Sequence, residues 1–144
     1  MQEILDKISH HGNSYTGRKL AAEDIILCQR QLMLNDMPQI PDDYLQLLHH
    51  FNSLNTDGAN LFGISPRGNA DFDILHENAL INLPKHNQNL VLGFDELEYL
   101  VWNTAAKCYQ TIDKDSFQVL NTYQSCETAL LEFLKLSDDY QYLY

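Results

Sequence analysis

Two acidic and aromatic segments contain the residues of this chain that are best suited to bind a partner. The first is the run 95–98, which leads directly into Tyr99 and Trp102, and the second is the C-terminal run 138–144. The candidate residues are the acids Asp95, Glu96, Glu98, Asp138 and Asp139 and the tyrosines Tyr140 and Tyr142. Aromatic side chains are enriched in protein interfaces, and carboxylates beside them suit a positively charged partner. The alternatives are a solvated turn with Trp102 in the core, and a tail that packs its tyrosines on a sheet edge.

The histidines and the paired aspartates do not form a recognisable metal site. His10–His11 and His49–His50 are neighbours in the chain, and adjacent helical residues point about 100° apart, so neither pair can chelate as an i,i+4 pair does. Asp113–Asp115 lacks the Gly and the Glu that a calcium loop needs at its sixth and twelfth positions. Asp71–Asp73 is typical of a strand whose acids face solvent. We therefore predict no metal ion and no cofactor.

The nucleophilic residues give no catalytic signature. Cys28, Cys108 and Cys126 are odd in number and widely spaced, which favours buried thiols in a reducing compartment over disulfides. The chain has no Gly-x-Ser-x-Gly, and the loop 63–68 lacks the endings of a P-loop or a dinucleotide site. We therefore predict no catalytic residues and no enzyme activity. One alternative stays open, namely a site assembled from Cys108 or Cys126 with a distant histidine.

The composition predicts one soluble domain with a strongly negative surface. The 144 residues are 44% hydrophobic, and no repeat or low-complexity segment divides them, so we expect a single domain over 1–144. The start of the chain is mixed in charge and no apolar run is long enough to span a membrane, which favours a cytoplasmic protein. The net charge of −11 repels nucleic acid and anionic lipid. It favours a basic protein partner, although solubility alone accounts for it equally well.

The elements that must position these residues begin with an amphipathic helix over 41–52. Pro41 suits the first helical position, and the acids that follow it complement the positive end of the helix dipole. The apolar stripe of this helix consists of Tyr44, Leu47, Leu48 and Phe51. Further helices are expected near 3–9, 22–35 and 125–136, and 77–83 could form a helical turn.

Strands are expected near 60–65, 71–75, 90–94, 98–104, 107–113 and 116–121. Polar turns separate the last strands, as expected for antiparallel neighbours. Helices first, then a series of strands, then a helix predict an α+β fold. We therefore expect an antiparallel sheet of about five or six strands with helices packed on one side.

The order of these segments resembles the SUKH superfamily, which includes yeast cell-wall-synthesis regulators and many bacterial immunity proteins. The resemblance covers roughly residues 20–136 and rests on two amphipathic helices joined by a short link, followed by a turn and a sheet. Its most specific parts are the helix start Ile40-Pro41-Asp42-Asp43-Tyr44 and the turn at Asn52.

The resemblance implies a non-enzymatic, protein-binding domain. In bacteria it implies an immunity protein that neutralises a secreted toxin by direct one-to-one contact. The expected partner is a basic, nuclease-like or deaminase-like toxin whose active site is occluded by an acidic, partly aromatic surface. The alternative is a scaffold or regulator that binds an endogenous partner, as the eukaryotic relatives do. Neither the resemblance nor the composition fixes the oligomeric state.

Overall fold

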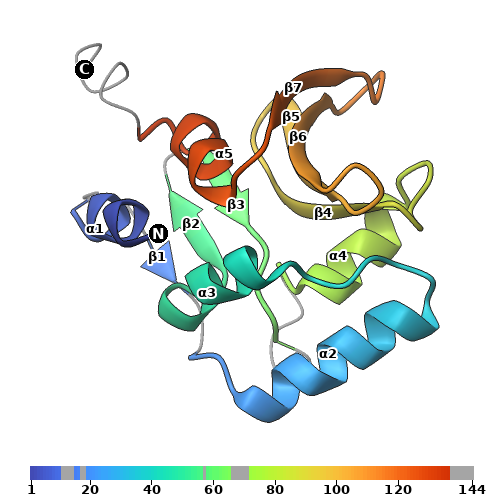
Figure 1. The fold of residues 1–144 in the computed structure, drawn as a ribbon, viewed down its shortest axis with the longest axis horizontal. Helices are drawn as coiled ribbons and strands as arrows, with labels where there is room; N and C mark the ends of the chain where they lie inside the picture. Colours follow the sequence, from blue (N-terminus) through green and yellow to red (C-terminus); the bar gives the residue numbers. More distant parts are fainter. Residues whose placement is uncertain (11–14, 17–18, 57, 66–71, 137–144) are drawn as a thin grey trace.

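A seven-stranded antiparallel sheet forms the centre of the fold, and the helices pack on one side of it (Figure 1). The computed structural model describes residues 1–10, 15–16, 19–56, 58–65 and 72–136. The helices of this part are α1 (Gln2–Ser9), α2 (Ala22–Leu34), α3 (Asp42–His50), α4 (Ile74–Ile81) and α5 (Cys126–Phe133). The strands are β1 (Tyr15–Thr16), β2 (Leu54–Thr56), β3 (Ala59–Leu61), β4 (Asn89–Phe94), β5 (Glu98–Asn103), β6 (Cys108–Asp113) and β7 (Val119–Tyr123). The predicted α+β class is confirmed.

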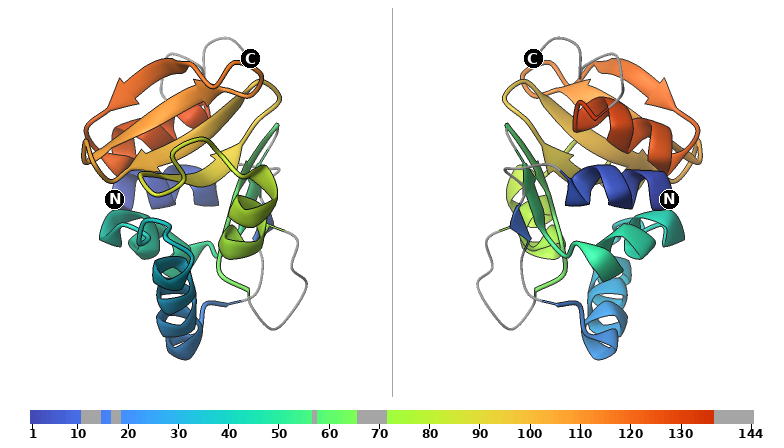
Figure 2. Two further views of the ribbon diagram at one scale, coloured as in Figure 1. Left: turned by 90° about the vertical axis from the view of Figure 1, so that its right-hand side faces the viewer. Right: turned by 90° about the vertical axis from the view of Figure 1, so that its left-hand side faces the viewer.

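The strands follow one another in the sheet in the order of the chain, from β1 to β7. The longer strands, β4 to β7, form a curved half of the sheet, and α5 lies beside it (Figure 1). α5 packs on β6 and β7, and α1 packs on α5. Figure 2 shows α2 extending away from the body at the opposite end from β7. Within the described residues, no helix combines the length and apolar character that crossing a membrane requires.

α3 anchors the helical layer to the sheet through its predicted apolar stripe. Tyr44, Leu47 and Leu48 are fully buried, whereas Phe51 is half-buried at the end of the helix. The Tyr44 hydroxyl group donates to the carbonyl oxygens of Phe62 and Leu92, the latter at 3.0 Å. Pro41 has an extended backbone (ψ 148°), so it is the N-cap and not the first helical residue, and the helix begins one residue later than predicted.

Two buried asparagine side chains bond to the backbone of neighbouring segments. Asn52 accepts from the Ile64 N–H at 2.8 Å and donates to the Ile64 carbonyl at 3.0 Å. Asn78, on α4, accepts from the Val91 N–H at 2.8 Å and donates to the Val91 carbonyl at 2.9 Å. Each amide thus satisfies a buried donor and a buried acceptor of the backbone.

The structure corrects the predicted elements at several places. It adds β1 and β2 to the predicted strands, and the last strand begins at Val119 rather than near residue 116. The strand predicted over 71–75 is wrong in its described part, because the Asp73 carboxylate accepts from the His76 N–H and caps α4. Asp73 is consequently buried and does not face solvent, while Asp71 lies outside the described residues. Residues 54–56 form β2 although the sequence predicts a polar turn there, because Leu54 and Thr56 are buried by contacts from distant parts of the chain.

Candidate functional site

A cavity of about 190 Å³ lies between α5 and the last three strands, and carboxylates dominate its charge. Asp95 comes from the turn before β5, Glu98 is the first residue of β5, and Glu132 lies in the last turn of α5. The other lining residues are Thr111, Asn121, Tyr123, Phe133 and Lys135. Three carboxylates therefore share this cavity with one ammonium group.

Hydrogen bonds among the residues of the acidic turn itself close it. The Asp95 carboxylate accepts from the N–H groups of Leu97 and Glu98 at 2.9 and 2.8 Å, and the Asp95 N–H donates to the Glu98 carbonyl at 3.0 Å. These bonds close a tight turn, as Asp side chains commonly do. Lys114 lies in the turn between β6 and β7 and contacts the acidic turn. Its N–H donates to the Leu97 carbonyl, and its ammonium lies 4.6 Å from the Phe94 ring centroid.

The electric field in the cavity favours a positive ligand. Partial burial raises the pKa of Glu98, and repulsion from Asp95 raises it further. A hydrogen bond from Thr111 and the charge of Lys135 lower this pKa, but they do not cancel the rise. A cation placed in the cavity would relieve the repulsion between the carboxylates, so the arrangement suits an ammonium or guanidinium group.

The predicted site residues divide into three groups. Asp95 and Glu98 line the cavity, whereas Glu96 is exposed beside it and does not line it. The C-terminal candidates, Asp138, Asp139, Tyr140 and Tyr142, lie outside the described residues. Trp102, which follows the acidic turn, is half-buried and packs its ring 4.8 Å from that of Tyr109.

Sequence reasoning missed the lining residues that arrive from other elements. Glu132 was assigned to a helix, but helical periodicity does not tell which strands the helix covers. Asn121 lies on β7 and donates to the Thr111 hydroxyl at 3.0 Å, a contact set by the pairing of β6 with β7. The only local signal for Glu132 is its position next to Phe133 of the apolar stripe.

The opposite face of the same strands carries an apolar groove. This groove, of about 360 Å³, is lined by the apolar residues Leu83, Pro84, Ile112, Phe117 and Val119 and by the polar residues Lys85, Gln88, Asn89, Asn103 and Gln110. Successive residues of a strand point to opposite faces, so Thr111 faces the acidic cavity and Ile112 faces the groove. Phe117, Val119 and Leu120 are 41%, 52% and 49% exposed. β7 therefore separates an acidic cavity from an apolar groove.

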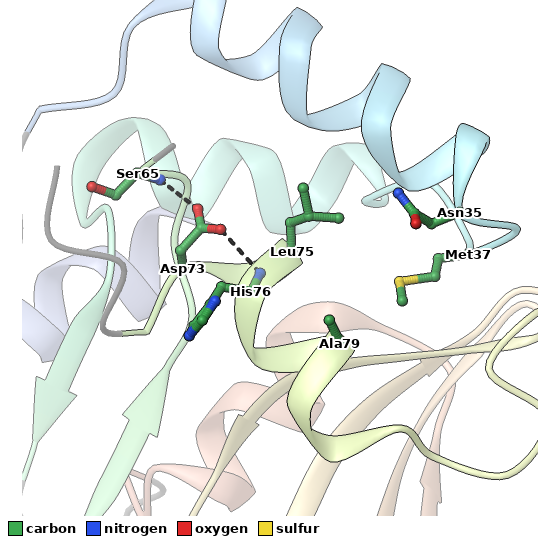
Figure 3. Close-up of a pocket in the computed structure, with 7 residues that line it drawn as sticks. All are labelled: Asn35, Met37, Ser65, Asp73, Leu75, His76 and Ala79. Atoms are coloured by element: carbon green, nitrogen blue, oxygen red, sulfur yellow. Dashed lines mark hydrogen bonds between the residues drawn. The ribbon is translucent and has the colours of Figure 1, made fainter. Parts of the chain in front are cut away.

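A second cavity, between α2 and α4, brings together a serine, an aspartate and a histidine (Figure 3). The Asp73 carboxylate accepts from the backbone N–H groups of Ser65 and His76, at 2.7 and 3.1 Å, and the Ser65 side chain points away from it (Figure 3). A catalytic triad needs the aspartate on the histidine ring and the ring on the serine hydroxyl. The bonds seen here cap α4 instead.

The structure describes two of the residue pairs considered as metal ligands, Asp113–Asp115 and His49–His50. The Asp113 carboxylate accepts from the N–H groups of Ser116 and Asp115, at 2.7 and 3.1 Å, and these bonds lower its pKa. His49 and His50 are exposed in the last turn of α3. Among the described residues, no group of three or more His, Cys, Asp or Glu side chains converges closely enough to hold a metal ion.

The cysteines are buried, and burial changes their chemistry. The pKa values of Cys28 and of Cys126 are raised to about 12, mainly by burial and in smaller part by the charges of Asp73 and Asp43, respectively. A hydrogen bond from Tyr109 opposes the rise at Cys126. A nucleophilic cysteine requires the opposite shift, because the thiolate is the reactive form.

We expect Cys28 and Cys126 to react with iodoacetamide at pH 8 on the order of 10³-fold more slowly in the folded protein than in guanidinium, from the thiolate fractions alone. Mass spectrometry of digested samples over time gives both rates. Rapid labelling of either residue at pH 6 would contradict this expectation and would support a cysteine enzyme.

Neither a protein-family model nor a curated protein matches this chain. The features that bear on function are therefore the acidic cavity, the edge strand β7 and the groove behind it. Because one fold supports many functions, these local features have more weight than the architecture.

Proposed function

We propose that this chain is a non-enzymatic, protein-binding domain that neutralises a basic protein, such as a secreted toxin, by covering its active site. The observation that carries the proposal is the acidic cavity formed by Asp95, Glu98 and Glu132. The resemblance to the SUKH superfamily supports it, since that superfamily includes immunity proteins with the predicted order of elements.

The cavity provides an electrostatic reason for a basic partner. Glu98 is a half-buried carboxylate, so it loses solvation, and the charges of Asp95 and Asp113 repel its ionised form in the unbound protein. A lysine or arginine of the partner would compensate both costs. The net charge of −11 would add long-range attraction and fast association.

Occlusion is the mechanism that fits these charges. Enzymes that act on nucleic acids bind phosphates with lysine and arginine side chains. An acidic protein surface can occupy those side chains in place of the substrate, so that the substrate is excluded. The chain itself would then bind neither nucleic acid nor membrane, because its charge repels both.

The partner can be identified by capturing the tagged chain from its native host and analysing bound proteins by mass spectrometry. The proposal expects one basic, stoichiometric partner that stops bacterial growth when expressed alone and permits growth when this chain is co-expressed. A housekeeping protein without toxicity would instead favour a scaffold or regulator and would count against neutralisation.

The double variant Glu98→Gln with Glu132→Gln tests the cavity directly. We expect its Kd for the captured partner, measured by calorimetry, to rise about tenfold or more, because basic groups of the partner would lose their counter-charges. Glu23→Gln, an exposed change on α2 far from the cavity (Figure 1), provides the matched control and should leave the Kd unchanged. Equal Kd values for all three proteins would contradict the assignment of this cavity.

The pH dependence has a defined sign because the pKa of Glu98 is raised. Between its ordinary and its raised pKa, the folded protein binds more protons at Glu98 than the unfolded chain does, so this group lowers the free energy of unfolding as pH rises. Binding of a cation needs the ionised form. Affinity for the basic partner should therefore weaken as pH falls through the raised pKa, whereas Glu98→Gln should flatten that part of the profile.

A further inference from the structure

β7 is the open edge of the sheet. It is the last strand in the order, so within the described part of the chain β6 is its one strand partner. Val119–Tyr123 spans five residues, whereas the strand at the other end, Tyr15–Thr16, spans two. Figure 1 and Figure 2 both place β7 on the outer rim of the molecule. Over residues 119–122, a strand in this position presents along its outer side N–H and C=O groups that β6 does not pair.

This edge lacks the charges that commonly protect an exposed strand. Residues 117–126 contain no charged side chain, in a chain whose net charge is −11. Natural proteins commonly protect such edges with lysine, proline, inward-pointing charges or a β-bulge, and of these devices β7 has a bulge at Leu120. Val119 and Leu120 are both about half exposed on the strand. The edge is therefore open to pairing with another extended segment.

The two faces beside this edge have different chemistry. On one face, Asn121 and Tyr123 of β7 line the acidic cavity with Glu98 and Glu132. On the other face, Val119 lines the apolar groove with its cross-strand neighbour Ile112. The bulge at Leu120 puts Val119 and Asn121 on opposite faces although they are two residues apart. A strand added beside β7 would point alternate side chains to these two faces.

We propose that an extended segment of the basic partner adds to the sheet as a strand beside β7. Its side chains alternate between lysine or arginine, which enter the acidic cavity, and apolar residues, which cover the groove next to Val119. Main-chain hydrogen bonds supply affinity in this mode, and alternate side chains supply specificity. The inference rests on the proposed function and specifies how the partner is held.

Charge also distinguishes this partner from a second copy of the chain. Two copies paired through β7 would bring together two proteins of charge −11 and two acidic cavities, and the paired segments would add no basic side chain, since residues 117–126 carry no charge. A basic and apolar segment complements both faces at once. The edge therefore fits a different protein better than it fits a second copy.

A synthetic peptide of alternating arginine and valine, nine residues long with blocked ends, is a direct probe. We expect it to shift the amide NMR signals of residues 119–123 and of Glu98, and to slow hydrogen exchange of β7 amides about tenfold or more. A peptide of the same composition with the arginines and valines in separate blocks, and one with glutamate in place of arginine, should give neither effect.

N-methylation of the peptide separates strand pairing from simple charge attraction. Methyl groups on every second amide block one hydrogen-bonding edge, so one of the two possible methylated peptides should bind as well as the parent and the other should not. Leu120→Lys should weaken binding of the parent peptide. Leu80→Lys, which replaces an exposed leucine of α4, should leave it unchanged.

Four results would overturn the inference. They are equal binding of both methylated peptides, signal shifts outside β7 and the cavity, absence of binding at millimolar peptide, and self-association of the chain with protection of its own β7 amides. Failure of strand addition is distinguishable from failure of the proposed function. A captured basic partner that leaves β7 exchange unchanged would overturn strand addition alone, whereas peptide pairing at β7 without any basic partner would overturn neutralisation alone.

Discussion

Gly63→Ala is expected to lower the free energy of unfolding by about 3 kcal/mol or more, because the new methyl group has no space. A Cβ atom at this position would lie 2.3 Å from the Asn52 side-chain oxygen and 2.4 Å from the Ser53 backbone nitrogen. The backbone cannot move away easily, since the Gly63 N–H and carbonyl bond to Phe72 and Ile74 and Asn52 holds Ile64 at both polar groups.

Gly58→Ala is the matched control for this substitution. No atom lies within 4 Å of a Cβ built at Gly58, so its cost comes from the left-handed backbone alone (φ +82°). We expect about 1 kcal/mol for that strain. Urea denaturation of both variants measures the difference, and a Gly63→Ala variant no less stable than Gly58→Ala would show that the Asn52 contact is not tight.

Asn78→Ala is the second large change, with an expected loss of about 3 kcal/mol in the free energy of unfolding. The Asn78 amide bonds to both backbone polar groups of Val91 and to the Ile74 carbonyl. Alanine would leave the Val91 N–H and carbonyl buried without these partners, so the full desolvation penalty of each group would apply.

An exposed asparagine provides the control, because replacing it with alanine makes the same chemical change without leaving buried backbone groups unpaired. Asn35 is exposed after the end of α2 and donates to the Gln31 carbonyl. Asn35→Ala should change the free energy of unfolding by about 0.5 kcal/mol or less. If urea denaturation gave similar losses for Asn35→Ala and Asn78→Ala, the bonds to Val91 would have no special weight in stability.

Local patterns predicted the elements whose signals are contained within one segment. The apolar stripe of α3, with Tyr44, Leu47 and Leu48, is a property of helical spacing and holds in the structure. The aromatic and β-branched residues of 98–103 likewise predict β5. Such signals need no knowledge of what the element packs against.

The elements that were missed depend on distant contacts or on a residue with two roles. β2 is three residues long, and the polar run around it resembles a turn until contacts from other parts of the chain bury Leu54 and Thr56. Asp73 fits both an exposed strand position and a helix N-cap. The structure selects the cap because the same carboxylate also accepts from the Ser65 N–H.

The residues of the candidate site also divide into those that a local pattern predicts and those that depend on distant contacts. Asp95 and Glu98 belong to one short acidic run, so the sequence alone singles them out. Glu132 and Asn121 complete the cavity only because α5 folds back over β6 and β7. That arrangement is a property of packing between segments, and no spacing of residues in this one sequence specifies it.

The most direct test of neutralisation by occlusion is a titration of the captured partner's own activity with this chain. The proposal predicts a linear fall that reaches complete inhibition at one equivalent, and a weaker inhibition by Glu98→Gln with Glu132→Gln at the same ratio. A complex that forms at one equivalent while the partner retains its full activity would contradict occlusion and would leave this chain a binding protein of another kind.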